Sequence, residues 1–97
     1  MTIDAALSRL SLGDPAGALA LLRPSDDAAD GNATEHAARG MILLAADRPD
    51  DARAALRLAV ALGADDPATL LNLALAEDRG GDRARARRLM HRVAEAE

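Results

Sequence analysis

The sequence has no cysteine, no aromatic residue and no lysine. Without cysteine, the chain has no disulfide framework, no thiolate nucleophile and no cysteine-ligated metal site. Without Phe, Tyr or Trp, it has no rings on which nucleic-acid bases could stack. The strand-forming β-branched aliphatic residues are also scarce, because the chain contains two Ile and two Val. These absences favour an all-α protein without thiol chemistry.

Signals for export or membrane insertion are missing as well. The start, MTID, has no basic flank and no apolar core, so it does not resemble a secretory signal. No uncharged apolar stretch approaches the ~20 residues that a membrane-spanning helix needs. We therefore expect a soluble protein of the cytoplasm.

Ala and Leu supply most of the apolar side chains that are present. Both residues favour helices, and the small side chain of Ala lets neighbouring helices approach closely. The length of 97 residues is typical of one domain with a modest core. We expect a single domain over residues 1–97.

One ten-residue stretch occurs three times in altered form, at a constant interval along the chain. The copies are GDPAGALALL, DRPDDARAAL and GDRARARRLM, which begin at residues 13, 47 and 81. Ala18, Ala52 and Ala86 coincide at this 34-residue interval. A fixed period of roughly 20 to 50 residues marks a stacked-repeat architecture, and 34 is the length of one helix–turn–helix unit.

Start and stop signals divide each repeat into two helices. Asp14, Asp66 and Asp82 are predicted N-caps, and proline follows the first two of them. Glycines at 13, 63 and 80–81 follow predicted helices, where a left-handed residue is favoured. The predicted helices cover residues 2–12, 15–23, 34–46, 50–62, 67–79 and 82–96, with a polar loop from 24 to 33.

Small residues recur where two helices of one repeat would meet. Gly40 lies in mid-helix, where glycine costs about 1 kcal/mol relative to alanine unless packing requires it. We expect Gly40 and Ala74 on the first helices to face Ala52 and Ala86 on the second helices, which would bring the paired helices close together.

The spacing resembles that of the tetratricopeptide repeat (TPR) family, whose pattern combines a large residue, Leu-Gly, an aromatic residue, and later Ala and a second aromatic residue. The corresponding residues are His36, Arg39, Gly40, Leu43, Ala52 and Leu56 in repeat two, and Leu70, Leu73, Ala74, Glu77, Ala86 and Met90 in repeat three. Every aromatic residue of the family pattern is missing. The resemblance implies an all-α, right-handed solenoid of about three helical hairpins (six helices), with repeats over approximately 1–33, 34–66 and 67–97.

No group of residues in the sequence resembles a catalytic site. The two histidines, His36 and His91, lie at different repeat positions and have no carboxylate at metal-ligand spacing on the same face. We expect His36 in the core and His91 on the surface. We predict no enzymatic activity, no catalytic residue, no metal and no cofactor.

The first helices of repeats two and three carry more apolar residues than one packed stripe needs. Leu71 and Leu75 lie beside a core stripe that Leu70, Leu73 and Ala74 already supply. In the resembled family, the first helices line an inner concave surface where partner peptides bind. Three explanations stay open, namely a ligand groove, a dimer interface or core. The predicted groove consists of Ala37, Met41, Leu44, Leu71, Asn72, Leu75, Asp78 and Arg79.

The residues of this groove also indicate what it would bind. Family members that grip a C-terminal carboxylate use Lys, Arg and Asn on the inner face. Only Asn72 matches such a position here, which argues against a carboxylate clamp. An apolar groove with a flexible Met suits an amphipathic helix or a hydrophobic segment.

The C-terminal end of the chain is basic although the whole chain carries a net charge of −4. Residues 79–97 contain six Arg and three acidic residues, which gives +3, whereas residues 1–78 contain six Arg and 13 acidic residues, which gives −7. This basic helix is either the polar cap of the stack or a docking surface for an acidic protein. The lack of aromatic residues argues against nucleic acid, and we expect neither nucleic acid nor membrane as a partner. The predicted acidic-partner surface is Arg83, Arg87, Arg88 and Arg92.

These observations predict a protein–protein interaction module. The expected function is that of an adaptor or chaperone holding a helical or extended segment of another protein. In size and in its apolar groove, the chain resembles the compact TPR-like chaperones of bacterial type III secretion. Two alternatives are a homo-oligomerising structural module and an electrostatic binder of an acidic partner.

Overall fold

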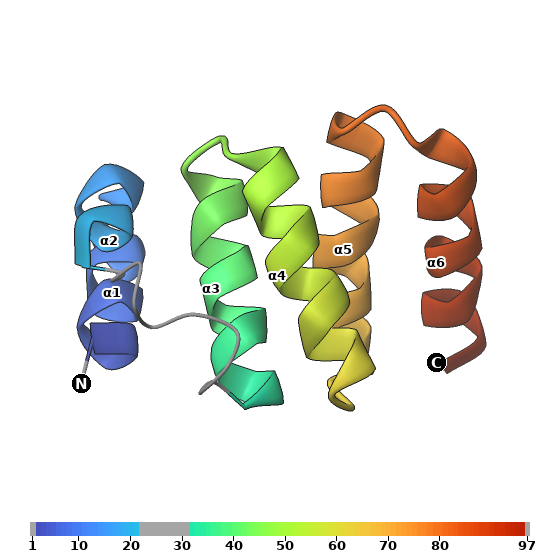
Figure 1. Cartoon of the computed structure of the whole chain (residues 1–97), viewed down its shortest axis with the longest axis horizontal. Helices are drawn as coiled ribbons and strands as arrows, with labels where there is room; N and C mark the ends of the chain where they lie inside the picture. Colours follow the sequence, from blue (N-terminus) through green and yellow to red (C-terminus); the bar gives the residue numbers. More distant parts are fainter. Residues whose placement is uncertain (1, 22–31, 97) are drawn as a thin grey trace.

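The computed structural model describes residues 2–21 and 32–96 and contains, within them, six α-helices and no strand (Figure 1). This agrees with the predicted all-α class. The helices are α1 (Thr2–Ser11), α2 (Pro15–Leu21), α3 (Ala33–Ala45), α4 (Pro49–Ala61), α5 (Pro67–Arg79) and α6 (Arg83–Ala96).

The helices pack as three antiparallel pairs in chain order. The pairs are α1 with α2, α3 with α4, and α5 with α6, and each pair leads to the next along the long axis of the molecule (Figure 1). Helix α3 packs against both helices of the first pair, and α5 packs against both helices of the second pair. Among the described helices, α6 packs against α5 alone and so stands at the end of the row.

The turns inside the three pairs have the same backbone hydrogen bonds at the 34-residue interval. The N–H of Asp14 donates to the carbonyl of Arg9 at 3.0 Å. The equivalent bonds run from Arg48 to Leu43 and from Asp82 to Glu77, both at 2.8 Å. The period that the sequence shows is therefore also a period of the backbone at these turns.

A left-handed residue closes each of these turns. Gly13 and Gly81 have φ values of 80° and 95°, as the sequence predicts for glycines that end a helix. The middle turn has Asp47 at the same position, with φ of 62°. Gly80 has φ of −80°, so the prediction of left-handed backbone at 80–81 is correct for Gly81 only.

The helix boundaries follow the predicted capping residues. Asp14, Asp66 and Asp82 each accept a hydrogen bond from the backbone N–H three residues later, at 2.9, 3.2 and 3.0 Å. Helix α5 has the predicted bounds, and α3 and α4 begin and end one residue earlier than predicted. The predicted loop 24–33 and the end of the predicted helix 15–23 lie mostly outside the described residues, although Asn32 is the N-cap of α3.

Small residues bring the paired helices together as expected. Ala18 and Ala52 are fully buried, and Ala86 is 8% exposed. A Cβ added to Gly40 on α3 would clash with the side chain of Leu56 on α4. Glycine is therefore required at position 40 by the close approach of α4, since the fully buried Leu56 has no space to move into.

The core is formed by two groups of apolar side chains. A small group joins α1, α2 and α3 and includes Ala6, Ala18 and Ile42. A larger group runs through α3, α4, α5 and α6, and it includes Leu44 and Leu56 together with Leu70 of α5. The second and third pairs thus share one continuous core.

Candidate partner-binding surfaces

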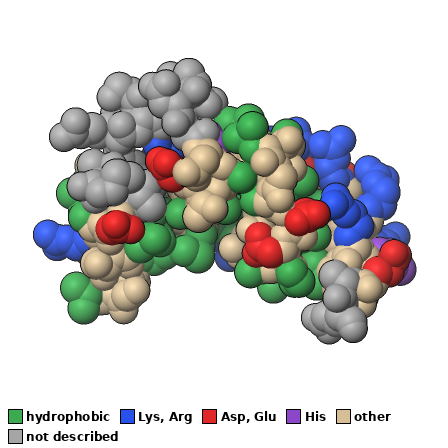
Figure 2. Space-filling view, turned by 90° about the horizontal axis from the view of Figure 1, so that it is seen from below, with side chains coloured by type: hydrophobic (Ala, Val, Ile, Leu, Met, Phe, Trp, Pro, Cys, Tyr) green, Lys and Arg blue, Asp and Glu red, His purple; other side chains and the backbone are tan. Residues whose placement is uncertain are grey.

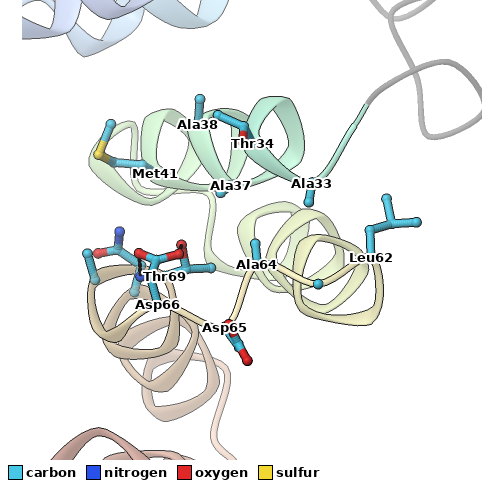
Figure 3. Close-up of a pocket in the computed structure, with 13 residues that line it drawn as sticks. Ala33, Thr34, Ala37, Ala38, Met41, Leu62, Ala64, Asp65, Asp66 and Thr69 are labelled. Atoms are coloured by element: carbon cyan, nitrogen blue, oxygen red, sulfur yellow. Dashed lines mark hydrogen bonds between the residues drawn. The ribbon is translucent and has the colours of Figure 1, made fainter. Parts of the chain in front are cut away.

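An open pocket of about 570 Å³ lies between α3 and α5. Ala37 and Met41 line it from α3, and Asn72 lines it from α5. The turn between α4 and α5 closes one side, where Ala64 lies opposite Ala37 (Figure 3). We call this the α3–α5 pocket. Three residues of the predicted groove, Ala37, Met41 and Asn72, therefore come together here.

The rim of this pocket carries a carboxylate with a perturbed pKa. The hydroxyl of Thr69 donates to Asp66 Oδ1 at 2.8 Å, and the Thr69 N–H donates to Oδ2 at 3.2 Å. Both hydrogen bonds favour the charged carboxylate, and the hydroxyl contributes most, so the pKa of Asp66 is lowered from its ordinary value. Asp66 therefore stays ionised at neutral pH, where it caps α5.

A second hollow, of about 440 Å³, lies between α5 and α6. Its apolar lining includes three large side chains that are unusually exposed, namely Leu71 at 38%, Leu75 at 43% and Met90 at 45%. Asp78, Arg83 and Arg87 stand among the lining residues as well. We call this the α5–α6 groove. It contains Leu71, Leu75 and Asp78 of the predicted groove.

The predicted groove is thus divided between two surfaces, and two of its members, Leu44 and Arg79, line neither. Leu44 is 7% exposed and lies in the large core group, so its prediction as a groove residue is wrong. It is buried because α5 packs across α3 and α4 at that point. Arg79 lines neither hollow, and its guanidinium donates to the Leu44 carbonyl at 3.2 Å, near the C-terminus of α3.

The arginines of α6 also divide into two sets. Arg83 and Arg87 line the α5–α6 groove, whereas Arg88 and Arg92 line a hollow of about 330 Å³ that Arg57 and Glu77 share. Basic side chains gather at the α6 end of the molecule (Figure 2). The predicted acidic-partner surface is therefore not one face, because its members lie on two sides of α6.

Sequence reasoning missed the central charge of this region. Glu77 is fully buried, and both of its carboxylate oxygens accept hydrogen bonds from Arg57 of α4, at 2.9 and 2.8 Å. Arg53 and Arg85 stand 3.8 and 3.7 Å from the same carboxylate. Glu77 joins α4, α5 and α6 through these ion pairs. Its partners lie on other helices, so no local pattern marks it.

His36 and His91 lie where the sequence places them. His36 is 2% exposed in α3, and its Nε2 has no hydrogen-bond partner among the described residues. His91 is exposed on α6. Within the described ranges, no three His, Asp or Glu side chains converge as metal ligands would.

No family model, no curated protein and no solved structure matches this chain. Among the described helices, none is both long and apolar enough to cross a membrane.

Proposed function

We propose that this chain is a non-enzymatic protein-binding module, an adaptor or chaperone that holds an apolar or amphipathic segment of a partner protein. The proposal includes a right-handed solenoid of about three TPR-like hairpins and a cytoplasmic location. The recurrence of one turn geometry at the 34-residue interval supports the repeat architecture, as does the packing of α3 and α5 on both helices of the preceding pair.

The observation that carries the proposal is the exposed apolar lining of the α5–α6 groove. Leu71, Leu75 and Met90 are large, are more than a third exposed and surround one hollow. Scattered exposed leucines need no explanation, but a contiguous apolar patch with a polar rim is typical of an interaction site. A partner that covers these side chains removes apolar area from water, and each side chain fully buried contributes about 1.5–3 kcal/mol.

Selection of displayed peptides on the purified protein tests this function. We expect enrichment of segments that bind the native chain and bind Leu75→Glu about tenfold more weakly or worse, because the charge prevents apolar burial. Leu12→Glu is the matched control, since Leu12 is 81% exposed in the turn between α1 and α2. Circular dichroism shows whether each variant keeps its helices.

A second variant, Met41→Glu, shows which of the two surfaces binds the segment when it is compared with Leu75→Glu. Met41 lines the α3–α5 pocket and not the groove. Loss of binding in Met41→Glu alone would move the site to the pocket. If no segment is enriched, or if both variants bind as well as the native protein, the proposed function is wrong.

A further inference from the structure

We propose that the α5–α6 groove takes an acidic amphipathic helix in the register in which α5 itself packs on α3 and α4. The partner helix would present two leucine-sized side chains at positions i and i+3 and a carboxylate at i+7, which pairs with Arg87. This inference rests on the proposed function and adds the chemical class of the partner.

The chain contains its own example of a helix in the equivalent place. Helix α5 lies across α3 and α4, and Leu70 and Leu73 are buried in one core group with Leu44 and Leu56 of those helices. Four residues after Leu73, the carboxylate of Glu77 pairs with the arginines of α4. Helix α5 therefore presents leucines at i and i+3 and a glutamate at i+7 to the pair that it covers.

The α5–α6 groove is the equivalent surface one repeat later, without a cover. Leu56 is fully buried beneath α5, whereas its equivalent Met90 is 45% exposed. Ala52 is fully buried, and its equivalent Ala86 lines the groove but is only 8% exposed, so Met90 carries the contrast. The contrast arises because α5 packs on the second pair and no described helix packs on the third pair in this way.

Part of the charge of the groove repeats with the same interval. Arg57, the hydrogen-bonded partner of Glu77, has His91 as its equivalent, so this part of the charge does not repeat. The second cation does: Arg53 is 3.8 Å from the Glu77 carboxylate, and its equivalent is Arg87, which lines the groove. Arg87 forms no ion pair among the described residues, while its neighbour Arg83 is 3.7 Å from Asp78. An acidic side chain at i+7 of an incoming helix would meet Arg87 as Glu77 meets Arg53.

A second copy of the chain is a poorer occupant than an acidic partner. Helix α1 is the first helix of the row, so it is the helix of a second copy that could continue the row by covering the groove. If α1 packed there as α5 packs on the second pair, Arg9 would take the place of Glu77, because the two residues are two repeats apart. Arg9 would meet Arg87 with like charge. Each α5–α6 groove carries Arg83 and Arg87 against Asp78, so a symmetric dimer through two grooves would bring together surfaces of the same net charge.

The test uses a helix-stabilised peptide with the sequence of α5, residues 67–79, in which the copies of Leu71 and Leu75 are replaced by Ala. The peptide keeps the copies of Leu70, Leu73 and Glu77, and stabilisation is needed because an isolated helix of this length is marginal in water. Two control peptides are matched to it. One has Gln in place of the Glu77 copy, and the other has Ser in place of both leucine copies.

Fluorescence anisotropy with the full chain should show binding of the Glu peptide and about fivefold weaker binding of the Gln peptide, as expected for a partly exposed charge pair. This difference should vanish in Arg87→Gln and shrink at high salt. The Ser peptide should not bind. Arg92→Gln is the control for a general charge effect, because Arg92 lines the hollow around Glu77 instead of the groove.

Each other result overturns the inference in a distinguishable way. Equal binding of the Glu and Gln peptides, lost in Leu75→Glu, retains the apolar groove and the proposed function but removes the acidic register. Equal binding of the Ser peptide shows attraction by charge alone. If no peptide binds, the helix register is wrong, and the display selection decides the proposed function separately. A concentration-dependent dimer in sedimentation that Leu75→Glu dissolves would assign the groove to a second copy.

Discussion

Glu77 stands at a position that the preceding repeat uses for an apolar side chain. Its equivalent one repeat earlier is Leu43, a core residue that is 9% exposed. The carboxylate remains buried because three arginines reach it, and their side chains keep exposed fractions of 26%, 43% and 45%. An ion pair of this kind is tolerated because the arginines stay partly in water while one carboxylate gives up its hydration.

Removing the charge and filling its place should therefore have different effects. Glu77→Ala should lower the free energy of unfolding by about 2–4 kcal/mol, because it leaves a cavity and breaks a buried pair. Glu77→Leu should cost about 1 kcal/mol, since it fills the space and the arginines can turn to solvent. Urea denaturation measures both, with the exposed Glu95→Ala as control. A Leu variant no more stable than the Ala variant would show that the charge itself matters most.

Asp66 offers a residue-scale test by titration. Its lowered pKa depends first on the Thr69 hydroxyl, so Thr69→Val should raise the pKa of Asp66 toward its ordinary value. Because the folded-state pKa lies below the unfolded one, the stability that Asp66 contributes is present above the unfolded value and is lost as the pH falls through the folded value. The Val variant should therefore lose less stability on acidification. NMR titration of the Asp66 carboxyl checks this, with Ser11→Ala as a distant control.

At the scale of the helices, local signals were sufficient for the boundaries but not for the assignment of faces. Asp66 and Pro67 mark the start of α5 because capping involves only neighbouring residues. Leu44 and Leu75 look alike in sequence, since each lies beside the core stripe of a first helix. The two leucines differ in what packs on them. Leu44 is covered by α5, which is separated from α3 in the sequence by the whole of α4, so no local pattern around Leu44 predicts its burial.

The left-handed residue of the middle turn was missed for a related reason. The sequence predicts left-handed backbone where glycine follows a helix, and Asp47 has a side chain that disfavours it. The 34-residue interval alone indicates a left-handed residue at Asp47, because Asp47 lies 34 residues after Gly13 and 34 residues before Gly81. A period in the sequence thus carries conformational information that single-residue preferences do not.

Substitutions at this turn test that equivalence. Asp47→Gly should raise the free energy of unfolding by about 0.5–1 kcal/mol, because glycine adopts positive φ without steric cost. Gly81→Ala should lower it by about 1 kcal/mol for the opposite reason. Gly80→Ala is the neighbouring comparison, since Gly80 has φ of −80°, and its cost would come from contacts of the added Cβ with Arg53 and the Ala76 carbonyl rather than from the backbone angle. Asp47→Gly without a gain in stability would contradict the assigned backbone.

At the scale of the whole molecule, the two ends of the row differ in charge and in cover. The pairs α1–α2 and α3–α4 are each followed by a helix that packs on both members, whereas the third pair has an exposed apolar groove and a basic α6. In a stacked-repeat protein, stability is close to a sum of repeat terms and neighbour interfaces. Under the repeat architecture that we propose, the third pair therefore lacks, among the described residues, an interface that the other two possess.

A variant of the chain that carries its own covering helix should be more stable than the native chain. A variant that continues the 34-residue period would carry a second copy of residues 64–79 directly after residue 97, with Glu97→Gly because its equivalent, Gly63, has φ of 108°. The added helix would cover Leu71, Leu75 and Met90 and place its carboxylate near Arg87. We expect the free energy of unfolding to rise by about 2 kcal/mol, since these side chains are partly buried already and the new helix must be ordered.

The control for the extended chain carries Ser at the copies of Leu70 and Leu73, which keeps the added length and charge but removes the apolar stripe. It should have the stability of the native chain. The extended chain should also lose its affinity for the α5-derived peptide, because its own helix occupies the groove. If the extension gains helicity yet leaves both stability and peptide binding unchanged, the added helix packs elsewhere. The α5–α6 groove is then not equivalent to the surface beneath α5.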